Sequence, residues 1–254
     1  MRRGLFALVA AVAVAAVVSA QPLVTGTLRA AFISTNPVQG RLDGSGRVVG
    51  PVGALVPALA GRLNVPFEIV PVASAAAVMA AVNDGSVTIG FLAFEQERAT
   101  QVDYSEPYAL MGNAYLVLAS GPFQRSVDVD RDGIVVGAVR GQSQQVWVSE
   151  HLREARVQAL DGVPPHPELV SLLTSGTVHA FAANRQRMTD TAQTDARVRV
   201  LPDNFSTIPQ AIVVRRGSSA LLAEINRIVA APETKALVRE SLREAQLAGV
   251  EPTP

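Results

Sequence analysis

Short apolar runs alternate along the chain with four-residue apolar spacings. Residues 27–34 (TLRAAFIS) predict a strand, and residues 67–72 predict another. Between them, Leu55, Leu59 and Leu63 share one face of a helix that we expect over residues 54–63. Pro57 is tolerable in this helix only near its first turn, because proline lacks the backbone N–H that an interior position needs. The start of the chain therefore predicts the order strand, helix, strand.

The same alternation continues to the end of the chain and restarts in a smaller unit after Gly121. The expected helices cover residues 74–82, 143–152, 167–174, 185–193, 219–230 and 234–248. The expected strands cover residues 87–91, 134–139, 178–182, 198–201 and 211–214. Parallel neighbouring strands need crossover connections, which helices usually provide. The pattern thus predicts an α/β fold with a largely parallel sheet covered on both faces.

The first residues have the order of a secretory signal peptide. Arg2 and Arg3 precede an apolar run from Leu5 to Val18, and small residues lead to Ala20. The alternative is a membrane anchor, but the run is shorter than the roughly 20 apolar residues that span a bilayer. We predict cleavage after Ala20, so residues 1–20 are removed. The chain has no cysteine, which excludes a lipid-modified lipoprotein, and we expect a free periplasmic protein.

Composition and short motifs exclude several function classes. The 22 basic and 22 acidic residues are interspersed without a basic stripe, so no nucleic-acid partner is expected. The segment from Asp128 to Gly133 imitates the start of a calcium loop, but its twelfth position is Val139, which predicts an acidic surface turn instead. His151, His166 and His179 have no ligand spacing, and the local signatures of hydrolases and nucleotide enzymes are missing. We expect neither a metal nor a cofactor.

One segment carries a specific resemblance. Residues 94–108 have the sequence FEQERATQVDYSEPY and follow the predicted strand that ends at Phe91. They resemble the family-3 extracellular solute-binding proteins of amino-acid ABC transporters, in which a strand and loop precede Thr-x-Glu-Arg and then Val-Asp-Phe-Ser-x-Pro-Tyr. Further matches cover nearly the whole predicted mature chain and lie at Leu28-Arg29, Val49-Gly50, residues 63–65, residues 135–141 and residues 212–217.

The resemblance implies a monomeric periplasmic-binding-protein fold of type II, with two α/β lobes and two crossover strands forming the hinge. The crossings are expected near residues 118–121 and 202–209. Lobe 1 then comprises residues 24–118 and 208–254, and lobe 2 comprises residues 121–203. The implied function is capture of a small solute by hinge closure and its delivery to a membrane ABC permease.

The resemblance also implies a ligand site. Arg98 matches an arginine that clamps a ligand carboxylate, and a planar guanidinium can donate two parallel hydrogen bonds to it. The alternative for Arg98 is a structural salt bridge with a neighbouring acid. Ser143 and Gln142 begin a lobe-2 helix, where they either hold the same anion or cap the helix. Phe91 is included because it lies at the end of the strand that leads to this segment.

Three positions depart from the family pattern and concern the ligand. Asn184 stands where a carboxylate usually meets the ligand ammonium, Ala93 replaces a hydroxyl contact, and Asn36 replaces an aromatic side chain. A buried ammonium without a counter-charge can cost several kcal/mol. We therefore expect a small anionic, carboxylate-bearing or amino-acid-like solute, with an anion lacking a buried ammonium preferred. Arg185, beside Asn184, either adds positive charge to the cleft or faces solvent.

Two other functions stay open on the same scaffold. An exported enzyme similar to cyclohexadienyl dehydratases would need an acid in the cleft, and Glu95 is the acid near the expected ligand position that the family pattern does not explain. A sensory binding protein would use the same closure to signal to a receptor. Neighbouring permease and ATPase genes would distinguish transport from sensing.

Overall fold

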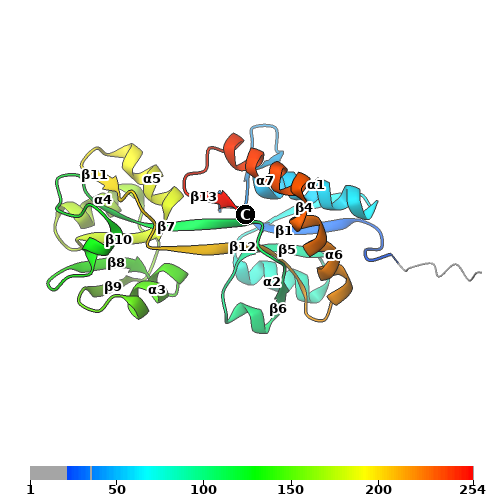
Figure 1. Cartoon of the computed structure of the whole chain (residues 1–254), viewed down its shortest axis with the longest axis horizontal. Coiled ribbons are helices and arrows are strands. Elements are labelled where there is room, and N and C mark those ends of the chain that lie inside the picture. Colours follow the sequence, from blue (N-terminus) through cyan, green and yellow to red (C-terminus); the bar gives the residue numbers. More distant parts are fainter. Residues whose placement is uncertain (1–21, 35, 254) are drawn as a thin grey trace, which may run out of the picture.

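Two long strands cross the middle of the molecule and join two groups of helices and strands. The computed structural model describes residues 22–34 and 36–253, so the predicted signal peptide lies outside the described residues. The crossing strands are β7 (Ala109–Leu118) and β12 (Ser206–Arg215), and Figure 1 shows them side by side between the two lobes. No helix among the described residues has the length and apolar character needed to cross a bilayer.

The first lobe is built around parallel strands. Strands β4 (Phe67–Val72), β1 (Leu28–Ile33) and β5 (Ile89–Ala93) pair in parallel in that order, and β12 pairs antiparallel with β5. The helices of this lobe are α1 (Pro51–Leu63), α2 (Ala75–Asp84), α6 (Ser219–Ala230) and α7 (Pro232–Glu244). Its shorter elements are β2 (Arg41–Leu42), β3 (Val48–Val49), η1 (Arg98–Thr100), β6 (Val102–Tyr104) and β13 (Val250–Pro252).

The second lobe repeats the arrangement on a smaller scale. Strands β9 (Arg156–Leu160), β8 (Val135–Val139) and β10 (Ala180–Asn184) are parallel, and β7 pairs antiparallel with β10. Its other elements are η2 (Ser126–Val129), α3 (Ser143–His151), α4 (His166–Thr174), α5 (Arg185–Thr194) and β11 (Val198–Val200). The predicted α/β class with two lobes is thus confirmed.

Strand β7 changes its partner in mid-course. It pairs with β12 from Ala109 to Asn113 and with β10 from Asn113 to Val117. This exchange lies earlier in the chain than the crossing expected near residues 118–121. The reason is that the turn after Leu118 closes β7 inside the second lobe, where Leu118 packs against that lobe's core. The limits assigned to the lobes stay a prediction.

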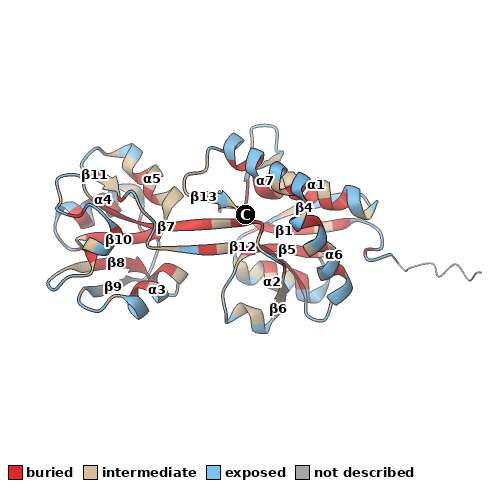
Figure 2. Ribbon diagram, viewed as in Figure 1, coloured by how far each residue is buried: buried red, intermediate tan, exposed pale blue. Residues whose placement is uncertain are grey.

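Each lobe buries its own apolar core. Leu55 and Leu59 of α1, which share the predicted apolar face, are fully buried in one cluster with Phe32 and Phe91. Figure 2 shows buried residues concentrated along the central strands of both lobes, with exposed residues on the outer helix faces. Packing of the helices onto the sheets therefore excludes water from the apolar core of each lobe.

Helix α1 departs from its prediction. It begins at Pro51, so Pro57 lies inside the helix and not near its first turn. Proline at the first position suits a helix start, because the N–H there has no helical partner anyway. The helix continues through Pro57 because Leu55 and Leu59, on either side, are held in the core. Tertiary packing here outweighs the local cost of an interior proline.

Two glycines of α1 provide a matched test of this packing. A Cβ added at Gly53 would lie 2.0 Å from the Val48 carbonyl oxygen of β3, whereas one at Gly61 would meet nothing within 4 Å. We expect Gly53→Ala to lower the free energy of unfolding by about 1–3 kcal/mol through overpacking. Gly61→Ala should raise it by roughly 0.5–1 kcal/mol, because alanine favours the helix. Denaturant unfolding measures both, and equal effects of the same sign would contradict this packing.

Candidate functional site

A cavity of about 200 Å³ lies between the two lobes. Most of its wall residues end or follow β1, β5, β8 and β10, and α/β sheets usually bind ligands at the carboxyl ends of their strands. The first lobe contributes Ile33, Asn36, Gln39, Ala75, Ala93, Glu95 and Arg98, and the second contributes Gly141, Gln142, Ser143, Gln144 and Asn184. Six of the seven residues predicted for the site therefore line one cavity.

Phe91 is the predicted residue that the structure does not bring to the cavity. Its side chain is fully buried in the first lobe's core, with its ring edge-to-face against Tyr108 at 5.8 Å. Phe91 and Ala93 point to the same face of β5, but Ala93 ends the strand and Phe91 lies deeper. Core atoms consequently cover Phe91.

Arg98 is both a cavity residue and half of an ion pair. Its Nη2 lies 3.1 Å from Glu95 Oε1, and its Nη1 donates to the Ala93 carbonyl at 3.5 Å. The side chains of Arg98 and Glu95 are 24% and 28% exposed, respectively. The salt bridge weighed as an alternative role for Arg98 is thus present, and it lies in the wall of the cavity.

Glu95 brings a carboxyl group to this cavity. Burial raises the pKa of the Glu95 carboxyl above its ordinary value, the charge of Arg98 opposes this shift, and the charge of Glu97 adds to it. A partly desolvated carboxylate favours a nearby positive charge. Glu95 is accordingly placed where it could supply the counter-charge that Asn184 lacks.

The second lobe presents the beginnings of two helices. Ser143 is the first residue of α3, and Gln142 precedes it without forming a side-chain capping bond. Asn184 precedes α5, and its Oδ1 accepts a hydrogen bond from the Arg187 backbone N–H at 2.8 Å. Asn184 is therefore a helix cap as well as a cavity residue.

Gln39 also lines the cavity, although no sequence pattern pointed to it. Its side chain is fully buried, and its Oε1 accepts a hydrogen bond from the Ile33 backbone N–H at 2.9 Å. This bond fixes the orientation of the amide, and Nε2 has no partner. The residue lies in a turn, where apolar periodicity gives no signal. The one sequence feature that could have indicated it is a polar residue close to the Asn36-Pro37 turn.

The profile of the bacterial extracellular solute-binding proteins, family 3, matches residues 28–241. The chain belongs to this family. The glutamine-binding protein GlnH of an ABC transporter from Bacillus subtilis (strain 168) is 27% identical over 143 residues, which are 56% of this chain. The match spans 51% of that relative, about half of its length.

Solved structures agree with this family-3 solute-binding protein in fold. An ancestral arginine-binding protein bound to glutamine is 26% identical, with a TM-score of 0.63 over 87% of this chain and 98% of its own. A binding component of an ABC transporter from Wolinella succinogenes DSM 1740, complexed with lysine, has a TM-score of 0.68 at 18% identity over 87% and 96% of the two chains. The predicted type II periplasmic-binding-protein fold is confirmed.

Another solved relative is an ancestral amino-acid-binding protein described as a precursor of cyclohexadienyl dehydratase. It has a TM-score of 0.64 and 22% identity over 86% of this chain and 94% of its own. At this identity the match supports the shared fold. The named relatives are binding proteins.

The cavity continues on both sides in the family-3 protein. One neighbouring cavity, of about 620 Å³, shares Glu95, Gly141 and Ser143 with it and adds two aromatic residues and two acids. These added residues are Phe94, Trp147, Glu97 and Glu150. The other, of about 580 Å³, shares Asn36, Gln142 and Asn184 and adds Arg187, Asp190 and His166. The three cavities therefore adjoin at shared wall residues, and the two outer ones differ in their charged groups.

A buried polar network connects this cleft to the crossing strands. Gln144 of α3 donates to Asn113 Oδ1 at 2.8 Å, and Asn113 donates to Ser206 Oγ at 2.9 Å. Asn113 is fully buried at the point where β7 changes partner, and Ser206 begins β12. The start of α3, which carries Ser143, is thus tied directly to both crossing strands.

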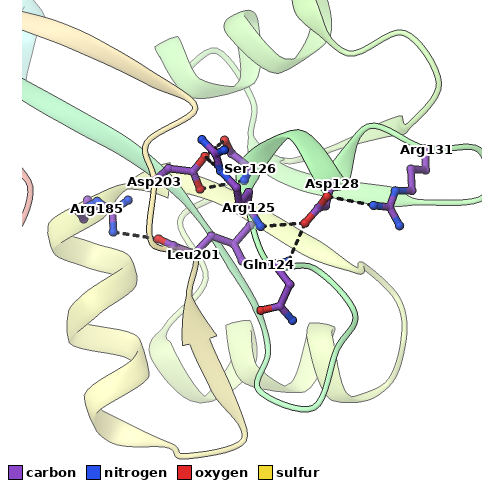
Figure 3. A network of polar contacts seen from close by, with 8 residues as sticks. All are labelled: Gln124, Arg125, Ser126, Asp128, Arg131, Arg185, Leu201 and Asp203. Carbon is purple, nitrogen blue, oxygen red and sulfur yellow. Dashed lines mark hydrogen bonds and ion pairs between the residues drawn. The ribbon is translucent and has the colours of Figure 1, made fainter.

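Arg185 lies outside the cleft that its sequence position suggested. Its Nε donates to Asn204 Oδ1 at 2.6 Å and its Nη1 donates to the Leu201 carbonyl at 3.0 Å, the latter drawn in Figure 3. It lines none of the three cavities described above. These contacts join α5 to the segment before β12. They therefore give Arg185 a structural role that differs from both expected ones, adding charge to the cleft or facing solvent.

The acidic turn near Asp128 uses its carboxylates within the protein. Asp128 accepts hydrogen bonds from the backbone N–H groups of Gln124 and Arg125 and pairs with Arg131 at 3.0 Å (Figure 3). These hydrogen bonds keep the pKa of Asp128 below its ordinary value. Within residues 22–34 and 36–253, no group of three or more His, Asp or Glu side chains is arranged to hold a metal ion.

The raised pKa of Glu95 predicts a pH dependence of stability. The unfolded chain releases the Glu95 proton near pH 4.5, whereas the folded chain retains it to higher pH. Stability from this group is complete below pH 4.5 and is lost as the pH rises through the folded pKa. We therefore compare the free energies of unfolding of the wild type and Glu95→Gln. The wild-type value minus the Glu95→Gln value should fall as the pH rises from 4.5 through the folded pKa of Glu95. Denaturant titrations at several pH values measure the difference, and a rise would mean that attraction to Arg98 outweighs burial.

Proposed function

We propose that this chain is the solute-binding subunit of an ABC importer and that it captures a small carboxylate-bearing or amino-acid-like solute between its lobes. One observation carries the proposal. Residues from separate segments of both lobes, selected by the family resemblance, surround a single cavity at the lobe junction. A solute held there would contact both lobes at once, so its binding favours the closed arrangement. The closed form would then engage the membrane permease.

Arg98 would hold the solute carboxylate from the first lobe. A guanidinium can donate two parallel charge-assisted hydrogen bonds to a carboxylate, and here its present partner is the neighbouring Glu95. Ser143 and the first amides of α3 would approach the same group from the second lobe. Closure would bring these donors together and exclude water from the charged contact, which strengthens it.

Glu95 broadens the class of solute. Asn184 offers no counter-charge for an ammonium, which favoured a plain organic anion. Glu95 lines the same cavity with a partly desolvated carboxyl group, so a zwitterionic amino acid could place its ammonium there. Relatives described above were solved with glutamine or lysine. We therefore propose that amino acids and small carboxylates both fall within the accessible class.

The mature protein would then be a free periplasmic monomer that begins after Ala20. Extracellular location is the family's property. The absence of cysteine from the whole sequence leaves no site for lipid attachment at the cleavage point.

Arg98→Ala should weaken solute binding strongly. A thermal-shift screen of amino acids and organic acids first identifies the ligand, because binding to the native state raises the melting temperature. Calorimetry should then give an affinity reduced by about 30-fold or more, the usual effect of removing one partner of a buried charge pair. Arg197→Ala is the control, since Arg197 is exposed and pairs with Asp195. Unchanged affinity in Arg98→Ala would refute the carboxylate clamp.

A dehydratase-like enzyme is the second candidate, and Glu95 is the observation that favours it. A carboxyl group with a raised pKa in a cavity is suited to act as a general acid. In this case Glu95 would donate a proton to the hydroxyl group of a substrate such as prephenate or arogenate, which leaves as water, while the ring carboxylate leaves as CO2 and its bonding electrons complete the aromatic ring.

Incubation of purified protein with prephenate or arogenate tests the enzyme directly. If the enzyme proposal holds, wild type turns over one of these compounds and Glu95→Gln reduces the rate by about 100-fold or more. A binding protein gives no turnover in either form. Turnover that survives unchanged in Glu95→Gln would remove Glu95 from the chemistry.

A further inference from the structure

Arg187 carries a half-buried positive charge with few partners. It lies in the first turn of α5, where its Nη2 donates to the Pro164 carbonyl. Its Nε is buried without a hydrogen-bond partner, and no ion pair of Arg187 occurs in the described part of the chain. Burial lowers the pKa of the Arg187 guanidinium, with the charge of Asp190 opposing this shift. The guanidinium is thus incompletely compensated in the absence of a ligand.

The cavity beside Arg187 is suited to one end of a solute. It has a volume of about 580 Å³ and shares Asn36, Gln142 and Asn184 with the central cavity that contains Arg98. The two cavities therefore adjoin at these three residues. Apolar residues supply part of its wall, and they would accommodate a short methylene chain. They are Pro37, Met111, Val139 and Val163.

The other ionisable groups of this cavity already have partners. Asp190 accepts a hydrogen bond from Gln186 Nε2 at 2.7 Å, and His166 Nδ1 lies 2.7 Å from Thr191 Oγ1. Neither group forms a recorded bond with Arg187. Arg187 is consequently the group in this cavity that an incoming anion would stabilise most.

We propose that Arg187 binds a second anionic group of the solute, and that the solute is a dicarboxylate of about the size of glutamate. One carboxylate lies on Arg98 and the other on Arg187, while Glu95 receives an ammonium when the solute has one. This inference rests on the proposed function, and it names the solute class. The rival is a cationic solute that extends instead toward Glu97 and Glu150 in the opposite cavity.

Calorimetry with L-glutamate, L-glutamine and L-arginine tests the inference on the whole mature protein. Glutamate and glutamine have the same shape and differ in the charge that Arg187 would meet. Wild type should bind glutamate at least about tenfold more tightly than glutamine, and Arg187→Gln should weaken glutamate binding by about 30-fold while changing glutamine affinity little. Arg185→Gln is the matched control in the same helical turn, because Arg185 lines neither cavity, and it should keep the wild-type preference.

A second variant tests the same cavity independently, in case Arg187→Gln does not fold. Val163 is 50% exposed and lines the same cavity, so Val163→Asp adds a carboxylate there without disturbing the core. It should also weaken glutamate binding selectively, through repulsion between like charges.

The outcomes separate the inference from the proposed function. Equal affinities of wild type for glutamate and glutamine, equal losses of both in Arg187→Gln, or tightest binding of arginine would overturn the dicarboxylate assignment alone. If wild type binds none of these three and no other amino acid or small carboxylate in the thermal-shift screen, the proposed function fails as well.

Discussion

The exchange of partners along β7 is the constraint on which the rest of the molecule depends. One half of this strand pairs with β12 and the other half with β10, so one continuous strand belongs to both lobes. The sheets of the two lobes are thereby placed so that segments after the carboxyl ends of their parallel strands face each other. A cleft at this junction follows from the topology, before any individual side chain is considered.

Polar side chains occur where this topology needs them. Asn113 marks the exchange and bonds to Gln144 and Ser206, so a buried amide connects the second lobe's first cavity helix to both crossing strands. Fully satisfied buried polar groups specify one arrangement, because any other arrangement leaves a donor or acceptor unpaired. Gln39 Nε2, at the central cavity, and Arg187 Nε, at the neighbouring one, are buried without a hydrogen-bond partner.

Sequence patterns were most informative where local rules and the family motif act together. The helix expected from residue 74 is α2, which Ser74 caps and which Gly85 ends in the left-handed conformation that glycine favours. The Glu97-Arg98 match placed Arg98 in the cavity wall. Local signals failed where tertiary contacts decide. Pro57 stays in a helix because its neighbours are buried, and β9 pairs with β8 although residues 156–160 were not among the expected strands.

The sequence also does not reveal which side chains pair with one another. The motif marks Arg98 but does not reveal that its guanidinium pairs with Glu95, which changes the charge that a solute meets. Phe91 follows the strand pattern into the core, two residues short of the cavity. Gln39 and Arg187 are recognised only because each has a buried nitrogen without a hydrogen-bond partner, which is a property of the folded chain.

A crystal structure of the protein with its tightest-binding amino acid or carboxylate tests the central claim most directly. The account predicts that the solute lies between the lobes, with a carboxylate on the Arg98 guanidinium and with Ser143 and Asn184 contributed from the other lobe. A solute bound elsewhere would contradict it, for example in the surface cavity between Arg41 and Glu244 of the first lobe.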